Sequence, residues 1–307
     1  MVFKKKNKED AVLEDFKLLR IVGKGTFGKV FQCLHIPSGK VYAMKCIRKD
    51  VVLENEALQS LKLEKEILYN IDHPFIVGMD YVFQNAQRIF FIMEFIEGGE
   101  LFRHLVKVRR FPEEQAKFMI AQIIIALGHL HEKNIVYRDL KPENVLFNKD
   151  GYLLLADFGL ATKVARNNLA KSFCGTAEYL APEMLQGKGH DHTVDLWTLG
   201  ILLYEMLVGI PPFFHKNKPQ MFYLIQEADL TFPDPQKHKI YVSPNAQSLI
   251  RKLLAKEKSK RIGAKKGVNE ILAHPFFENL DIDQLMAKQI KPSYTPDINE
   301  GEFKYFD

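Results

Sequence analysis

Apolar and polar residues alternate along the first third of the chain with the two-residue period of β-strands. From Phe16 to about Ile92 this period recurs in FKLLRIV, GKVFQCL and VYAMKCI, and IPSGK between the last two is typical of a hairpin turn. One stretch, NEALQSLKLEKEILYNI (residues 55–71), instead places apolar residues at helical spacing. The pattern predicts a small sheet accompanied by one main helix.

Beyond EGGE (residues 97–100) the period becomes helical. PEEQAKFMIAQIIIALGHLHEK begins with a proline and two acidic residues, as helix N-termini often do. Further helices are predicted in DHTVDLWTLGILLYEML, PNAQSLIRKLL and VNEILAH, whereas the last thirty residues are punctuated by prolines and predict an irregular tail. We therefore expect an α+β fold in which a β-rich part joins a mainly helical part near residues 94–100.

Composition narrows the class of protein. The 307 residues are 47% hydrophobic and carry a net charge of only +5, which is too small a surplus for a nucleic-acid-binding protein. Three scattered cysteines without C-x-x-C spacing indicate a reducing compartment and argue against a disulfide framework or a zinc site. No signal peptide is recognisable, so we expect a cytoplasmic protein, with the nucleus as a second location.

The longest apolar stretch, LWTLGILLYEMLVGIPPFF (residues 196–214), is nearly long enough to cross a bilayer. It contains Glu205 and is broken by Pro211 and Pro212. A charged residue inside a membrane span is costly, so we expect a buried core helix and no transmembrane segment.

The segment GKGTFGKV contains Gly23, Gly25 and Gly28 in G-x-G-x-x-G spacing. A dinucleotide-binding turn is one interpretation, and Asp50 lies about twenty residues further on, where such a turn requires an acid. A dinucleotide-binding turn is followed by a helix. Here, however, Val30 begins a strand, and the chain then returns through a hairpin. The remaining interpretations are an ordinary glycine-rich hairpin and a flap whose backbone N–H groups close over phosphates.

Lys45 lies within the alternating strand VYAMKCI, where a buried ammonium is costly unless it is paired. Glu64 is on the predicted helix, on the same face as Leu61, Leu68 and Ile71. A Lys45–Glu64 ion pair would leave the ammonium directed at a phosphate. The alternative is a lysine that extends along the surface to reach water.

The segment IVYRDLKPENVLF (residues 135–147) gathers charged side chains between apolar ones. Asp139 can accept the proton of an attacking hydroxyl, and Lys141 can stabilise a transferring phosphate. Asn144, together with Asp157 directly after the strand LLLA, offers the oxygen ligands that suit Mg²⁺. Phosphoryl transfer needs such positioning and charge neutralisation.

Together with APE (residues 181–183), DLWTLG (195–200) and RIG (261–263), these motifs resemble the eukaryotic protein kinases over nearly the whole chain. The resemblance implies a bilobal fold that uses ATP and Mg²⁺. It divides the chain into a leader (1–15), a kinase domain (16–277) with an N-lobe (16–94), a hinge (94–97) and a C-lobe (98–277), and a tail (278–307).

The resemblance also implies roles for single residues. Met93 would be the gatekeeper, and Glu94 and Ile96 would belong to the hinge. Three apolar side chains would enclose the adenine: Val30, Ala43 and Leu146. Four would stack as the regulatory spine: Leu68, Met79, Tyr137 and Phe158. Glu183 and Arg261 would form a buried ion pair.

KPEN and GTAEY resemble serine/threonine kinases, and Thr176 would meet Asp139 and Lys141. Within kinases the chain is most similar to the AGC group, near protein kinase B and the serum- and glucocorticoid-induced kinases. Glu100, which would also border the nucleotide, and Glu143 match positions that bind arginine three residues before the target, and Glu205 matches one for a second arginine. Basic protein substrates are therefore expected. The chain departs from the pattern at Ala177, where many relatives have proline. It also departs at Ser60, where some members have a histidine that contacts the activation-loop phosphate.

Ser172 matches the activation-loop phosphosite, and a phosphate there would pair with Arg138. Leu169 lies three residues before Ser172, so we expect a separate upstream kinase. In EFKYFD, the residues Phe303, Phe306 and Asp307 fit either a hydrophobic motif or, preferably, an active-site tether. A monomeric kinase is expected, and a pseudokinase that only binds nucleotide is the alternative.

Overall fold

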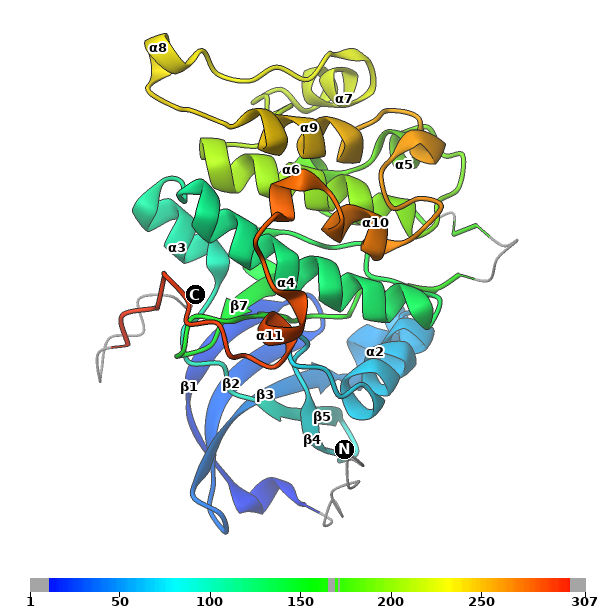
Figure 1. The fold of residues 1–307 in the computed structure, drawn as a ribbon. Coiled ribbons are helices and arrows are strands. Elements are labelled where there is room, and N and C mark those ends of the chain that lie inside the picture. The colour runs from blue at the N-terminus through cyan, green and yellow to red at the C-terminus, as the bar shows by residue number, and fades with distance from the viewer. Residues whose placement is uncertain (1–10, 165–168, 171, 299–307) are drawn as a thin grey trace.

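The computed structural model describes residues 11–164, 169–170 and 172–298. A five-stranded antiparallel sheet in the order β1-β2-β3-β5-β4 forms the N-terminal part. Its strands are β1 (Phe16–Gly25), β2 (Gly28–His35), β3 (Lys40–Arg48), β4 (Met79–Gln84) and β5 (Arg88–Glu94). Helix α2 (Leu58–Asn70) lies beside the sheet, on the side of the larger helical part (Figure 1).

The C-terminal part is mainly helical, which confirms the α+β, bilobal class. Helices α4 and α6 lie at its centre, and α9 packs on the far side of α6 (Figure 1). The helices are α3 (Leu101–Val108), α4 (Glu113–Glu132), α5 (Pro182–Leu185), α6 (Thr193–Val208), α7 (Lys218–Glu227), α8 (Pro235–His238), α9 (Pro244–Leu253), α10 (Val268–Leu272) and α11 (Ile282–Met286).

Two short antiparallel ribbons lie where the two parts meet. They pair β6 (Ile135–Val136) with β9 (Thr162–Lys163), and β7 (Val145–Phe147) with β8 (Leu153–Leu155). The 3₁₀ turns are η1 (Leu13–Asp15), η2 (Pro142–Asn144), η3 (Ala177–Tyr179), η4 (Lys258–Lys260) and η5 (Pro275–Phe277). The ribbons fix the ends of the segment that carries the charged motif.

Helix α6 is buried along nearly its whole length, as expected for the apolar stretch that contains it. Leu199, Ile201 and Met206 are fully inaccessible to solvent. Within the described ranges, no helix combines the length and the apolar character that crossing a membrane requires.

One apolar core extends from the sheet into the helical part. The four predicted spine residues, Leu68, Met79, Tyr137 and Phe158, are buried in this same cluster. The rings of Tyr137 and Phe158 meet edge to face, with centroids 5.4 Å apart. Helix α2 and the segment after β8 are therefore joined through continuous side-chain packing.

Within the part expected to be helical, the structure adds α3, α5, α7 and α8 to the four helices named from the sequence, and it differs further in two short helices outside them. A further helix, α1 (Lys49–Glu54), follows β3, and the tail predicted to be irregular contains α11, whose first turn is capped by Asp281. Five or six residues are too few to show a helical period, which explains both omissions. Phe303, Phe306 and Asp307 lie outside the described residues, so the two interpretations of the last segment stay predictions.

Candidate active site

The glycine-rich segment closes an antiparallel hairpin, with Gly25 opposite Gly28 at the end of β1 and β2. No helix follows it, so the dinucleotide-binding interpretation is wrong. A Cβ atom on Gly28 would lie 1.8 Å from the carbonyl oxygen of Cys46, whereas one on Gly25 would meet nothing within 4 Å. Gly23 would make only ordinary contact with Val30. The third glycine is therefore required by packing against β3, and the first two leave backbone accessible.

Lys45 on β3 is paired and does not extend to the surface. Its Nζ atom lies 2.6 Å from Glu64 Oε1 on α2 and 3.1 Å from Asp157 Oδ1. Burial opposes the charged ammonium, but the two carboxylates outweigh burial and raise the pKa of Lys45. Burial raises the pKa of Glu64, an effect that Lys45 partly offsets, whereas Lys45 lowers the pKa of Asp157. Helix, sheet and the segment after β8 thus meet at one ammonium group.

Asp139 is held from two sides in the loop after β6. Asn144 Nδ2 donates to the Asp139 backbone oxygen and to its Oδ2, each at 2.8 Å. Lys141 Nζ lies 3.2 Å from Asp139 Oδ2. Thr176 Oγ1 donates to Asp139 Oδ1 at 3.3 Å and accepts from Lys141 at 3.0 Å. The structure brings together Asp139, Lys141, Asn144 and Thr176, to which the sequence analysis assigned different roles in one site.

The loop that carries Asp139 has an unfavourable backbone conformation that α6 stabilises. Arg138 has a φ of +69°, in the left-handed region that non-glycine residues rarely adopt. Asp195, fully buried on α6, accepts from the backbone N–H groups of Tyr137 at 2.9 Å and Arg138 at 2.8 Å. His131 Nε2 lies 2.7 Å from the same carboxylate. The sequence had identified Asp195 only as part of DLWTLG, without this role.

Asn144 and Asp157 provide a donor set that fits a hard divalent cation. Asn144 uses its amide N–H groups on Asp139, so its side-chain oxygen remains as the acceptor. The backbone N–H of Ala156 donates to the Asn144 carbonyl oxygen at 2.9 Å, which brings the segment of Asp157 alongside. One amide oxygen and one carboxylate suit Mg²⁺, which usually takes few protein ligands and completes its shell with phosphate and water.

The residues expected around the adenine lie on adjoining segments. Ala43 on β3 is opposite the predicted gatekeeper Met93 on β5, and Leu146 on β7 forms a bridge with Glu100. Met93 and Leu146 pack against a small apolar cluster that contains the hinge residue Ile96. Val30 on β2, opposite Lys45, is only partly buried, like Ala43 and Leu146, and Glu94 is exposed. Apolar surface therefore remains accessible between the sheet and β7.

The carboxylates of Glu100, Glu143 and Glu205 interact electrostatically, with Glu143 acting on both of the others. Burial raises the pKa of Glu205 to about 7, and the charge of Glu143 contributes; Tyr179, whose hydroxyl donates to Glu205, opposes the rise. Burial likewise raises the pKa of Glu100 to about 6, and Glu143 again contributes. Glu143 is thus near both of the other carboxylates, and the charges of Arg103 and Lys141 also act on Glu100 and favour its ionised form. The contact of Tyr179 with Glu205 had no sequence signal, because no motif or periodicity relates the two positions.

Ser172, the predicted phosphosite, lies against Arg138. Arg138 Nη1 donates to Ser172 Oγ at 2.5 Å, and its Nε donates to the Leu160 carbonyl oxygen at 2.7 Å. Ser60, where the chain departs from the family pattern, lies on α2 and carries no charge. On α2, Glu66 instead pairs with Lys163 of β9 at 2.6 Å, a pair that sequence spacing could not reveal.

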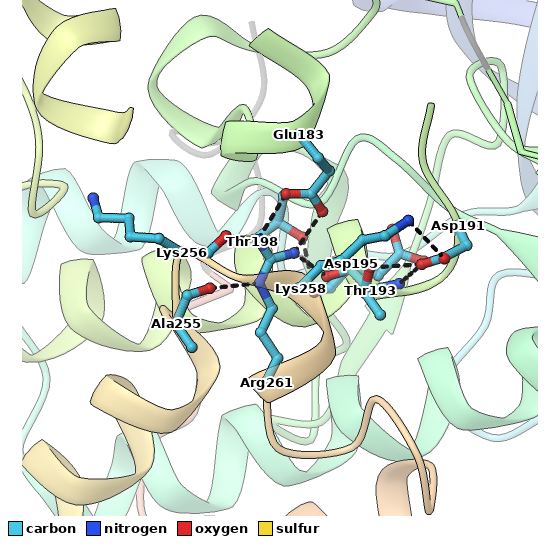
Figure 2. A network of polar contacts seen from close by, with 9 residues as sticks. All are labelled: Glu183, Asp191, Thr193, Asp195, Thr198, Ala255, Lys256, Lys258 and Arg261. Carbon is cyan, nitrogen blue, oxygen red and sulfur yellow. Dashed lines mark hydrogen bonds and ion pairs between the residues drawn. The ribbon is translucent and has the colours of Figure 1, made fainter. Parts of the chain in front are cut away.

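Glu183 and Arg261 form the predicted buried pair (Figure 2). Arg261 Nη1 and Nη2 donate to the two Glu183 carboxylate oxygens at 2.6 and 2.7 Å. The same guanidinium donates to the carbonyl oxygens of Thr193 at 2.9 Å and Ala255 at 3.0 Å. One arginine therefore joins α5, the start of α6 and the segment after α9.

Comparisons with known proteins agree with this geometry. The family model described as "Protein kinase domain" matches residues 16–277. Protein kinase 2 of Dictyostelium discoideum is 44% identical over 296 residues, which cover 96% of this chain and 60% of that protein. The RAC family serine/threonine-protein kinase homolog of the same organism is 41% identical over 295 residues, covering 95% and 64%.

The serine/threonine-protein kinase Sgk1 of Xenopus tropicalis is 43% identical over 296 residues, covering 95% of this chain and 69% of that protein. The chain spans only about six-tenths of the length of Protein kinase 2 and of the RAC family homolog. These similarities confirm the resemblance to AGC-type serine/threonine kinases. The chain belongs to the protein kinase domain family.

Proposed function

We propose that this protein is a serine/threonine kinase that transfers the γ-phosphate of ATP to hydroxyl groups of protein substrates. The observation that supports it best is that two groups of charged side chains, one around Lys45 and one around Asp139, lie next to each other. Lys45, held by Glu64, contacts Asp157, and the segment of Asp157 is bonded through its backbone to Asn144, which holds Asp139. A nucleotide phosphate and a substrate hydroxyl can be positioned by these two sets together.

In this proposal Asp139 is the base that accepts the hydroxyl proton as the substrate oxygen bonds to phosphorus and the bond to the ADP oxygen breaks. The two Asn144 hydrogen bonds hold the carboxylate in place. Lys141, 3.2 Å from Asp139, neutralises the charge on the transferred group. ATP with Mg²⁺ would supply the phosphoryl group, with Asn144 and Asp157 as protein ligands of the metal. Lys45 would hold the α- and β-phosphates.

The acidic site formed by Glu100, Glu143 and Glu205 supports a preference for basic substrates. We propose that Glu100 and Glu143 receive an arginine three residues before the target, and that Glu205 receives a second one. Arginine forms short, charge-assisted hydrogen bonds with carboxylates, so a site with three carboxylates discriminates strongly against neutral peptides. Thr176, bonded to Asp139 and Lys141, would border the acceptor hydroxyl.

Phosphorylation of Ser172 by a separate kinase is the regulation we propose. The Arg138 guanidinium already contacts the Ser172 hydroxyl and adjoins Asp139 in the chain, so a phosphate there would act on the loop of the base. Leu169, not an arginine, lies three residues before Ser172, which makes the segment a poor substrate for the specificity proposed above.

The alternative, a pseudokinase that binds nucleotide without transferring phosphate, is disfavoured because Lys45, Asp139, Asn144 and Asp157 are all present and in contact. Two measurements on one sample separate the two functions. Calorimetry reports ATP binding with and without Mg²⁺, and transfer of labelled γ-phosphate to a basic serine peptide reports catalysis. Binding without transfer by Ser172-phosphorylated protein would favour the pseudokinase.

A further inference from the structure

His190 is a buried histidine for which neither the catalytic site nor the acidic substrate site provides a role. It lies in the turn before α6, is 2% exposed, and its Nε2 atom lies 3.5 Å from Arg138 Nη1. This is the same nitrogen of Arg138 that donates to Ser172 Oγ at 2.5 Å. His190 and Ser172 therefore approach one guanidinium group from two different segments of the chain.

The backbone fixes this arrangement. Ala170, two residues before Ser172, exchanges two N–H···O hydrogen bonds with His190, each 2.9 Å long. A Cβ atom on Gly189 would lie only 2.9 Å from the Leu169 side chain, so the two strands of chain are in close contact. Ser172 therefore follows, two residues on, a segment that is hydrogen-bonded to the segment of His190.

The charges at this place do not balance once Ser172 is phosphorylated. A phosphoserine carries about −1.5 to −2 charges at pH 7, whereas Arg138 supplies one positive charge. Ser172 itself is exposed but Arg138 is only 8% exposed, so a phosphate that reaches the guanidinium also comes close to the buried imidazole. A second cation beside Arg138 would balance the remaining charge.

We propose that His190 is this second cation: the Ser172 phosphate is bound by Arg138 and by the protonated imidazole of His190 together. The inference rests on the proposed regulation of the kinase through Ser172. The imidazole now lies beside an arginine N–H donor, which suits the neutral ring with an accepting Nε2. A phosphate oxygen would instead accept from Nε2–H.

The surrounding charges permit this change of protonation. Burial lowers the pKa of His190, and so does Arg138, whereas Glu183, Asp195 and Asp191 raise it. These three carboxylates already have partners of their own: Arg261 for Glu183, His131 and two backbone N–H groups for Asp195, and Lys258 for Asp191. None of them needs His190, yet all favour its charged form. A phosphate dianion would add to this effect and offset that of Arg138.

Two NMR titrations of the Ser172-phosphorylated chain test the proposal without using catalysis. Phosphoserine is introduced at position 172 during synthesis, the ³¹P shift reports the second pKa of the phosphate, and the imidazole resonances report His190. We expect the His190 pKa to be higher in the phosphorylated than in the unmodified chain. In His190→Phe we expect the phosphate pKa to rise by about 0.5–1 unit, because the cation that favours the dianion is lost.

His190→Gln, which retains a donor but cannot carry charge, should raise the phosphate pKa similarly and decides the question if the phenylalanine variant does not fold. His192→Gln is the matched control, because the ring of His192 lies against His131 instead. An identical phosphate pKa in His190→Gln and the unsubstituted chain would overturn the proposal. So would a His190 that stays neutral beside the phosphate at pH 6. Neither result depends on whether the protein is an active kinase.

Discussion

Lys45 Nζ lies 2.6 Å from Glu64 Oε1, and this ion pair joins the sheet to α2 in a place where only 3% of Glu64 is exposed. A carboxylate so deeply buried depends on its partner. The same ammonium reaches Asp157, so the pair also determines the position of a proposed metal ligand. Stability and the geometry of the active site are therefore coupled at this contact.

Replacing Lys45 by methionine should destabilise the fold in a pH-dependent way. Unpaired Glu64 would keep a pKa above that of the unfolded chain, because burial already raises it. The folded state then binds more protons, and stability falls as pH rises. We expect a loss of about 3 kcal/mol in the free energy of unfolding at pH 8 and a smaller loss at pH 5.

Urea denaturation of the variant and the unsubstituted chain measures this loss at both pH values, and equal losses would contradict the argument. Lys45→Met with Glu64→Leu should be less sensitive to pH.

Gly28 and Gly25 should respond differently to alanine. In Gly28→Ala the new methyl group would overlap the Cys46 carbonyl oxygen, so β2 must move away from β3. We expect a loss of about 1–3 kcal/mol and a weaker affinity for ATP. In Gly25→Ala the methyl group has space, so stability should be nearly unchanged. Thermal unfolding of the two variants side by side checks this, and equal melting temperatures would show that the close approach is not rigid.

The Glu183–Arg261 pair should be essential for the helical part. Arg261→Leu leaves the Glu183 carboxylate buried without its partner, and the carbonyl groups of Thr193 and Ala255 lose a donor. The expected loss is about 3–5 kcal/mol in the free energy of unfolding. Lys260→Ala serves as the control, since its ion pair with Glu257 is exposed and should contribute nothing measurable. Chemical denaturation would refute the prediction if the two variants were equally stable.

Recognition of a second substrate arginine should strengthen between pH 6 and 8. The pKa of Glu205 is raised to about 7, so about a tenth of it is ionised at pH 6 and about nine-tenths at pH 8. The ratio of kcat/KM for a peptide with two arginines to that for its alanine counterpart should rise several-fold across this range. Effects of pH on the chemical step cancel in the ratio. In Glu205→Gln the ratio should be low and independent of pH; a rise that persists there would assign the titration to another group.

Much of this architecture could be predicted from local patterns. The alternating strands, the long helices α4 and α6, and the pairing of Lys45 with Glu64 follow from period and from the cost of burying a charge. Two other contacts between separate elements could not be derived in this way. Tyr179 with Glu205, and Arg138 with His190, are contacts between loops or ends of elements, and no periodicity relates their positions.

The most direct test of the central claim is phosphate transfer from Mg-ATP to an arrayed library of serine and threonine peptides. The Ser172-phosphorylated chain is compared with the same chain carrying Asp139→Asn, which retains the shape of the side chain and loses the carboxylate. We predict transfer that favours peptides with arginine three residues before the acceptor and that falls by a factor of about 10² or more in the variant. Absence of transfer by the phosphorylated chain, or equal transfer by both proteins, would contradict the account.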